Sequence, residues 1–199
     1  MSALPDPKGK MTEAEYLAFE RESAFKHEFV DGEVYMMTGA SARHNRITFS
    51  INSVLGPQIR GKGCSGYSPD MRVRTPQTGT YAYPDVTIVC GDEQLAEDDK
   101  MVLLNPTVIF EVLSPSTESY DRSKKFEYYR EIASLQEYIL VSQDRAYIER
   151  FVRQDGESWV YITFNGLDAT LELVSIDCRL PLAEIYEQVD FESVDAEDN

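Results

Sequence analysis

The sequence has only two histidines and lacks the short motifs that mark the commonest nucleotide, cofactor and hydrolase sites. It contains no G-x-x-x-x-G-K-[ST], no G-x-G-x-x-G, no H-E-x-x-H and no G-x-S-x-G. These absences argue against P-loop, dinucleotide-binding, zinc-protease and serine-hydrolase chemistry. Two histidines also leave a histidine-rich zinc site short of ligands. We therefore expect no organic cofactor.

Long apolar runs and cysteine pairs are also missing. No apolar run approaches the roughly 20 residues that span a bilayer, and residues 1–20 contain no apolar signal-peptide core. The cysteines are Cys64, Cys90 and Cys178, an odd number at wide spacing without C-x-x-C. This pattern argues against a disulfide framework and a cysteine zinc site, and it favours a reducing compartment. We expect a cytoplasmic protein with no membrane partner.

Basic residues are scarce, with 19 Lys and Arg against 35 Asp and Glu and a net charge of −16. Such a balance argues against nucleic acid as a partner. The acids are concentrated, however: residues 91–99 hold five and residues 187–199 hold six, without any Lys or Arg. Outside these two segments 24 acidic residues face 19 basic ones, so the objection is weakened but not removed.

A chain of 199 residues without repeats fits one domain with its own core. We expect a flexible N-terminus at 1–10, one domain at 11–186 and an acidic tail at 187–199. The patterns predict helices at 12–23, 43–61, 120–132 and 181–189, with Pro57 shortening or kinking the second. They predict a hairpin around Asp31-Gly32 and a loop at 61–67. They also predict strands at 71–75, 83–90, 107–114 and 137–142 and β-rich segments at 146–164 and 169–176. This order predicts an α/β (α+β) domain with a central mixed sheet flanked by helices.

Two acids interrupt apolar strands. Glu111 lies within the run 107–113, and Asp85 heads the run 85–90. Consecutive strands are usually neighbours, so both carboxylates can meet on one face of the sheet. There they repel each other unless a cation lies between them, and an all-oxygen site suits Mg²⁺ or Mn²⁺. Alternatively, Glu111 faces solvent at a sheet edge and Asp85 is a turn residue after a proline.

The predicted helix at 120–132 follows directly from the strand of Glu111. Asp121, Lys125 and Tyr129 fall four residues apart, so they share one face of that helix. Lys125 can then lie over the two carboxylates, where an ammonium group can hold a scissile phosphate and stabilise developing negative charge. The alternative is an ordinary surface lysine with a partly buried stem.

Several segments together resemble a known family. They are "KHEFVDGEVYMMTGAS", "RHNRI", "SPDMRV", "YPDV", "FEVLSPST", "DRSKKFEYY" and "LQEYILVSQD". In their order and spacing, from about residue 11 to residue 185, they resemble the Uma-type restriction endonuclease family of the PD-(D/E)XK nuclease superfamily. The resemblance implies a restriction-endonuclease-like core with a metal site at one edge of the sheet. It implies Asp85 and Glu111 as the metal-binding acids, with the carbonyl of Val112 as a further ligand.

The resemblance also draws attention to Asp70, Glu28 and His44. Asp70 is either a metal ligand or part of an Asx-turn, and Glu28 is either an additional metal-shell acid or a surface residue. His44 is a water-activating base, a phosphate contact or only a helix cap.

The sequence departs from the superfamily signature in two places. The signature has Lys two residues after the second acid, but Leu113 stands there. The lysine must then come from elsewhere, and Lys125 is our candidate. The 26 residues from Asp85 to Glu111 are also a long separation, which we attribute to a surface hairpin or loop formed by the acidic segment 91–99.

These observations give three hypotheses. The first is a Mg²⁺- or Mn²⁺-dependent endonuclease that hydrolyses DNA, with Asp85, Glu111, Lys125 and His44 as catalytic residues and Arg43, Arg46, Arg60 and Lys62 as backbone contacts. The second is a catalytically silent nuclease-fold module for protein or nucleic-acid interaction, favoured by the acidic surplus and by Leu113. The third is an oligomeric scaffold. A homodimer suits the first hypothesis, because cutting a duplex takes two cuts.

Overall fold

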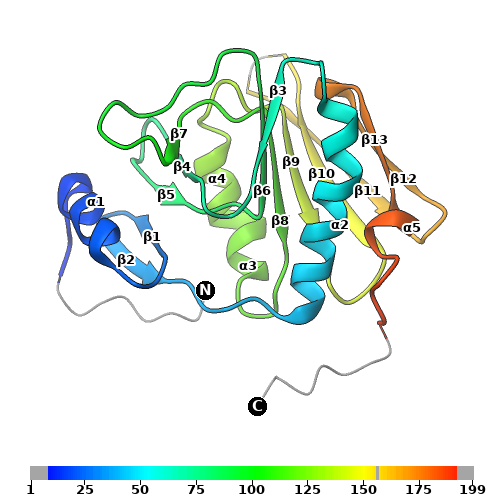
Figure 1. Cartoon of the computed structure of the whole chain (residues 1–199), viewed down its shortest axis with the longest axis horizontal. Coiled ribbons are helices and arrows are strands. Elements are labelled where there is room, and N and C mark those ends of the chain that lie inside the picture. Colours follow the sequence, from blue (N-terminus) through cyan, green and yellow to red (C-terminus); the bar gives the residue numbers. More distant parts are fainter. Residues whose placement is uncertain (1–8, 156, 192–199) are drawn as a thin grey trace.

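The computed structural model describes residues 9–155 and 157–191 (Figure 1). Its N-terminal part consists of α1 (Glu13–Glu22), β1 (His27–Val30) and β2 (Glu33–Met36). The predicted capping box is confirmed, because the Thr12 and Glu15 side chains each bond the other's backbone N–H. The predicted hairpin is confirmed too: Asp31 and Gly32 both have positive φ, as a tight two-residue turn requires.

A mixed six-stranded sheet forms the centre of the molecule, in the order β11-β10-β9-β8-β6-β3. Its strands are β3 (Cys64–Tyr67), β6 (Val86–Cys90), β8 (Val108–Val112), β9 (Glu137–Val141), β10 (Tyr147–Arg153) and β11 (Trp159–Asn165). β8 and β9 are parallel, and the other neighbours are antiparallel. A second, five-stranded sheet has the order β2-β1-β5-β4-β7, with β4 (Arg72–Arg74), β5 (Tyr81–Ala82) and β7 (Val102–Leu103).

Helices cover both faces of the central sheet. One face packs against α2 (Ala42–Ile59), the β12–β13 hairpin (Thr170–Leu173 and Cys178–Pro181), the short 3₁₀ helix η2 (Val174–Ile176) and α5 (Leu182–Ile185). The other face packs against a continuous helical segment made of α3 (Glu118–Tyr120), the π-helix η1 (Asp121–Lys125) and α4 (Phe126–Tyr129). The predicted mixed α/β class, with a mixed sheet flanked by helices, is confirmed.

Strand alternation decides which side chains of β8 face which helix. Phe110 and Val112 pack into the core cluster that contains the α2 side chains. Ile109 and Leu113 pack into the cluster that contains Tyr129 of α4. Glu111 has the same parity as Ile109 and Leu113, so it faces the η1–α4 segment.

Some local predictions were wrong. The helix predicted at 43–61 ends at Ile59, two residues after Pro57, whose missing N–H removes one hydrogen bond of the last turn. The segment 61–67 is not only a loop, since β3 pairs with β6 there, and the short strands β5 and β7 were not predicted. The helix predicted at 120–132 contains the π-helical turn η1, a feature frequent at functional sites. The prediction for segment 91–99 is confirmed: it is a mostly exposed loop that returns through a Leu95–Leu103 bridge.

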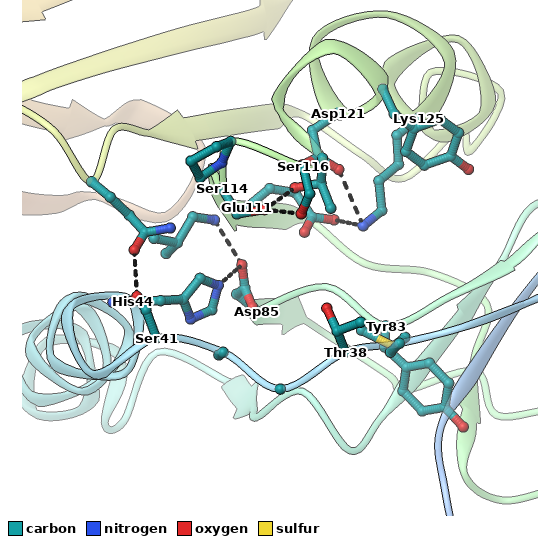
Figure 2. Close-up of a pocket in the computed structure, with 18 of the residues that line it drawn as sticks. Thr38, Ser41, His44, Tyr83, Asp85, Glu111, Ser114, Ser116, Asp121 and Lys125 are labelled. Atoms are coloured by element: carbon teal, nitrogen blue, oxygen red, sulfur yellow. Dashed lines mark hydrogen bonds and ion pairs between the residues drawn. The ribbon is translucent and has the colours of Figure 1, made fainter. Parts of the chain in front are cut away.

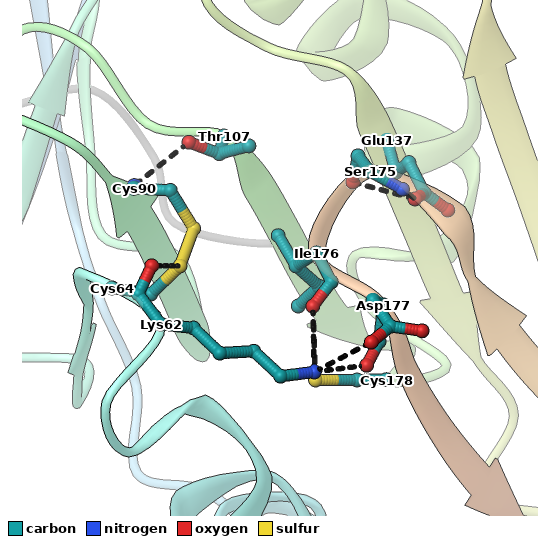
Figure 3. Close-up of a disulfide and its surroundings, with 9 residues drawn as sticks. All are labelled: Lys62, Cys64, Cys90, Thr107, Glu137, Ser175, Ile176, Asp177 and Cys178. Carbon is teal, nitrogen blue, oxygen red and sulfur yellow. Dashed lines mark hydrogen bonds and ion pairs between the residues drawn. A yellow bond between two sulfur atoms is a disulfide. The ribbon is translucent and has the colours of Figure 1, made fainter.

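The cysteine prediction is also corrected. Cys64 and Cys90 form a disulfide, and Cys178 is free and buried (Figure 3). The antiparallel register of β3 and β6 places Cys64 directly opposite Cys90, with 4.0 Å between their Cα atoms. Spacing along the chain does not reveal such a pair. The cysteine-based reason for expecting a reducing compartment therefore no longer holds.

Within the described ranges no helix is long and apolar enough to cross a membrane. Most of the predicted flexible N-terminus (1–8) and of the predicted acidic tail (192–199) lies outside the described residues.

Candidate active site

A cavity of about 400 Å³ opens at one end of the central sheet (Figure 2). Its walls come from the start of α2, the residues just before β6, the end of β8, the η1 helix and two segments, 36–41 and 114–117. Asp85, Glu111 and Lys125, the three residues expected to converge, all line this cavity. Glu28, Asp121 and His44 line it as well.

Asp85 and Glu111 are held by neighbouring strands. The β6–β8 register pairs Val86 with Phe110, and one further step places Asp85 opposite Glu111 on the same face. The Val112 N–H donates to Asp85 Oδ2 at 2.7 Å, which fixes the Asp85 carboxylate against the end of β8. The two acids therefore meet at the site for the reason that the strand pattern predicted.

Lys125 extends from η1 into the cavity and is buried among carboxylates. Its Nζ lies 2.9 Å from Glu111 Oε1, 3.1 Å from Glu28 Oε1 and 3.5 Å from Asp121 Oδ1. Burial by itself lowers the pKa of Lys125, but the Glu111 and Glu28 carboxylates outweigh it and hold that pKa well above its usual value. Lys125 is thus a fixed positive charge at the centre of the acidic cluster.

Glu111 is the most perturbed acid of the site. Burial raises the pKa of Glu111 well above its usual value, Lys125 opposes this, and the nearby Asp121, Asp85 and Glu28 raise it further. The Tyr129 hydroxyl donates to Glu111 Oε1 at 3.1 Å, and burial raises the pKa of Tyr129, so that hydroxyl stays protonated. Among the residues that the structure describes, Lys125 is thus the one cation paired with three buried acids, Glu28, Glu111 and Asp121, so this cluster holds more acidic than basic groups.

The two central carboxylates each keep one oxygen uncommitted. Asp85 accepts through Oδ2, and Glu111 accepts through Oε1. No hydrogen bond from the described residues reaches Asp85 Oδ1 or Glu111 Oε2. The site can therefore offer these two oxygen atoms to coordinate a metal ion.

His44 approaches Asp85 from the first turn of α2. Ser41 caps this helix by accepting the His44 N–H at 3.0 Å. His44 Nε2 lies 3.2 Å from Asp85 Oδ2, and because a carboxylate only accepts, Nε2 carries the proton. His44 Nδ1 is buried and has no hydrogen-bond partner among the described residues. His44 therefore orients Asp85.

Other predicted site residues are not brought to the cavity. Asp70 is exposed and forms an ion pair with Lys26, so the structure places it away from the two acids. Arg60 follows the far end of α2, about 24 Å along the helix from His44, and Lys62 binds Asp177 and the Ile176 carbonyl.

Arg43 and Arg46 lie in the first turns of α2, close to the cavity. The Arg43 guanidinium contacts the Gln143 carbonyl at 3.5 Å and Asp144 at 3.7 Å, and Arg46 is exposed. With Arg60 and Lys62 at the other end of the helix, the four predicted backbone contacts do not form one patch.

Several residues that line the cavity are not predicted from the sequence, chiefly Gln143, Tyr83 and Tyr120. Gln143 donates to the Leu113 carbonyl at 2.5 Å and accepts from Ser41 Oγ at 2.8 Å, so it ties the end of β8 to the start of α2. The Tyr83 N–H donates to Glu28 Oε1 at 3.3 Å. The only sequence signal for these residues was their adjacency to Asp85, Asp121 and the end of an apolar strand.

The donor set fits a hard divalent ion. Asp85 and Glu111 offer one oxygen each, and Val112 lines the same cavity. Mg²⁺ commonly binds through one or two carboxylates while water and phosphate supply its remaining ligands. Within 9–155 and 157–191, no group of three or more His, Cys, Asp or Glu could hold a metal ion. Any ion bound here would therefore have Asp85 and Glu111 as its carboxylate ligands, with the remaining positions left to a backbone carbonyl, water and phosphate.

Similar proteins cover most of the chain. One uncharacterized protein of Synechocystis sp. is 35% identical over 162 residues, which cover 81% of this chain and 92% of that protein. A second from the same organism is 32% identical over 185 residues, covering 93% and 96%. A crystal structure from Anabaena variabilis, described as a "putative nuclease" of DUF820, superposes with a TM-score of 0.71 at 18% identity, covering 90% of this chain and 99% of that one.

At that identity the Anabaena structure shows that the fold is shared. The sequence match decides the family: residues 13–183 match Uma2, described as "Putative restriction endonuclease". Together with the two Synechocystis relatives, this match shows that the chain belongs to the Uma2 family.

Proposed function

We propose that this protein is a Mg²⁺- or Mn²⁺-dependent nuclease that hydrolyses phosphodiester bonds of DNA. One observation carries the proposal: Asp85 and Glu111 meet in one cavity with an uncommitted oxygen each, beside the buried ammonium of Lys125. Two carboxylates that bind a hard cation, with a lysine beside them, can supply the activated water and the charge stabilisation that phosphodiester hydrolysis uses.

Each residue has a distinct part in this proposal. Asp85 and Glu111, with the Val112 carbonyl, hold the metal ion, which when bound activates a water and neutralises charge on the phosphate. Lys125 keeps its proton and stabilises the negative charge that develops on the phosphate. His44 holds the Asp85 carboxylate in place through its Nε2–H. Glu28, Asp121 and Tyr129 fix Lys125 and Glu111 in turn.

In this proposal the lysine comes from the helix η1 and not from the strand that carries Glu111. Leu113 is buried in the core beside α4, so no charged group comes from the position where the signature has lysine. In this proposal Lys125 supplies the positive charge from η1 instead, with its Nζ 2.9 Å from Glu111 Oε1. This contact gives the site the positive charge that Leu113 does not supply, which supports the nuclease over the catalytically silent module.

The proposal is tested by cleavage of single-stranded DNA, linear duplex and closed plasmid with Mg²⁺ or Mn²⁺. The wild type is compared with Asp85→Asn and Glu111→Gln, and with Asp70→Asn as a matched control outside the cavity. We expect metal-dependent cleavage by the wild type and the control, and a loss of at least about a hundredfold in the two site variants. Equal cleavage by all four proteins would contradict the assignment of the site.

A further inference from the structure

The groups proposed to be reactive have little exposed surface. The side chains of Glu111 and Lys125 are only 5% and 6% exposed, and those of Asp85 and His44 are each 14% exposed. The loops 36–41 and 114–117 contribute to the walls that surround them. The backbone of the nucleic acid must therefore bend so that the scissile phosphate enters the cavity.

An intact duplex does not readily supply such a phosphate. Its phosphates follow a stiff double helix with a persistence length of about 50 nm, and each is fixed between its neighbours. A single strand is free of this restraint, because its nucleotides can be splayed out and its backbone bends easily. Enzymes that act on a base, which is hidden inside the duplex, likewise work on single strands or extrude the nucleotide into a pocket.

The charge of the cavity favours the same substrate. Among its described lining residues are five carboxylates, on Glu28, Asp85, Glu111, Asp121 and Asp144, and one lysine, Lys125. A duplex brings one negative charge for about every 1.7 Å of its axis, so a long stretch of it is repelled by these acids. A strand that presents one or two phosphates at the metal is repelled far less.

The cavity wall also holds a donor without an acceptor. Tyr120 lines the cavity, and its buried hydroxyl has no hydrogen-bond partner among the described residues. Burial raises the pKa of Tyr120, so this hydroxyl stays protonated and can donate. The volume of about 400 Å³ is in the range of small-ligand pockets, which suits one nucleotide.

From this geometry we propose that the cavity takes an unpaired nucleotide of single-stranded DNA, with the Tyr120 hydroxyl as one of its contacts. Intact duplex is then a poor substrate. This inference rests on the proposed nuclease function and specifies its substrate.

The test compares initial cleavage rates on one sequence in three forms: a linear single strand, a fully paired duplex, and a duplex with a central unpaired bubble. All three carry the same fluorescent label and are incubated with wild-type protein and Mn²⁺. We expect the single strand to be cut at least about tenfold faster than the duplex, with cuts in the third substrate confined to the bubble. Equal rates on the single strand and the duplex would overturn the inference while leaving the nuclease proposal intact.

A second variant tests the contact by itself. Tyr120→Phe removes only the hydroxyl, so the KM for the single strand should rise several-fold while kcat stays within about twofold, as expected for a binding contact. Tyr128→Phe is the control, because its hydroxyl bonds Asp31, which does not line the cavity. An unchanged KM in Tyr120→Phe would contradict the part given to Tyr120. No cleavage of any form, together with no Mn²⁺ binding, would instead contradict the nuclease proposal itself.

Discussion

Lys125 Nζ lies 2.9 Å from Glu111 Oε1, although the two residues belong to different elements and are fourteen positions apart. The contact joins the π-helix η1 to the end of β8. It places the positive charge of the site on a helix, where the related nuclease signature has it on the strand. The same contact gives Lys125 a structural role beside the catalytic role that we propose, and the two roles need separate tests.

Lys125→Met should destabilise the protein strongly. It leaves Glu28, Glu111 and Asp121 buried without their shared cation, and breaking a buried ion pair from one side costs about 3–5 kcal/mol. Urea denaturation measures this as a lower midpoint. Lys124→Met is the matched control, since Lys124 is exposed and should change stability by less than about 0.5 kcal/mol. A Lys125→Met protein as stable as the wild type would show that the acids are already neutral.

Glu111→Gln should increase the stability of the metal-free protein, and more so at higher pH. Burial raises the folded-state pKa of Glu111 well above 4.5, so the protonated carboxyl stabilises the folded state. This contribution to stability is complete below the pKa of the unfolded state and is lost as pH rises through the pKa of the folded state. Glutamine is neutral throughout, and Lys125 keeps Glu28 and Asp121 as partners. Between about pH 5 and about pH 8 the Tm advantage of the variant should widen by several degrees. An advantage that narrows as pH rises would contradict the raised pKa.

Gln143→Leu should lower activity without touching the metal ligands. Gln143 links the Leu113 carbonyl to Ser41, and Ser41 caps the helix that carries His44. Loss of the Gln143 amide leaves the Leu113 carbonyl without a hydrogen-bond donor, at a cost of about 1–3 kcal/mol, and loosens the His44–Asp85 contact. We expect a reduced kcat with metal affinity weakened by about tenfold or more. Gln154→Leu, at an exposed position, is the control and should behave as wild type.

Thiol counting tests the Cys64–Cys90 disulfide. Unfolded protein purified without reductant should show one free thiol, that of Cys178, and reduction should raise the count to three. The disulfide links residues 26 positions apart, and removing it should lower the free energy of unfolding by about 3.5 kcal/mol. Three free thiols before reduction would contradict the pairing.

The sequence was sufficient to predict the main elements and the centre of the site. Strand alternation and strand adjacency put Asp85 beside Glu111, and helical spacing put Lys125 on the face that reaches them. These are local patterns that the tertiary structure did not override. The capping box at Thr12 and the Asp31-Gly32 hairpin were predictable for the same reason.

What could not be predicted depends on contacts between distant segments. The Cys64–Cys90 pair follows from the register of β3 against β6, and the glycines at 61–67 predict a loop where β3 forms. Asp70 has a side chain suited to binding a metal ion, but it is exposed to solvent and forms an ion pair with Lys26. Gln143 contacts Ser41 across about a hundred residues, and no local pattern indicates such a contact.

The most direct measurement of the central claim is Mn²⁺ binding by calorimetry on four proteins: the wild type, Asp85→Asn, Glu111→Gln and the exposed control Asp70→Asn. The account predicts one site in the wild type and in the control, and at least about tenfold weaker binding in the other two, because each variant removes a charged ligand. Equal Mn²⁺ binding by all four proteins would contradict the assignment of Asp85 and Glu111 as the metal centre.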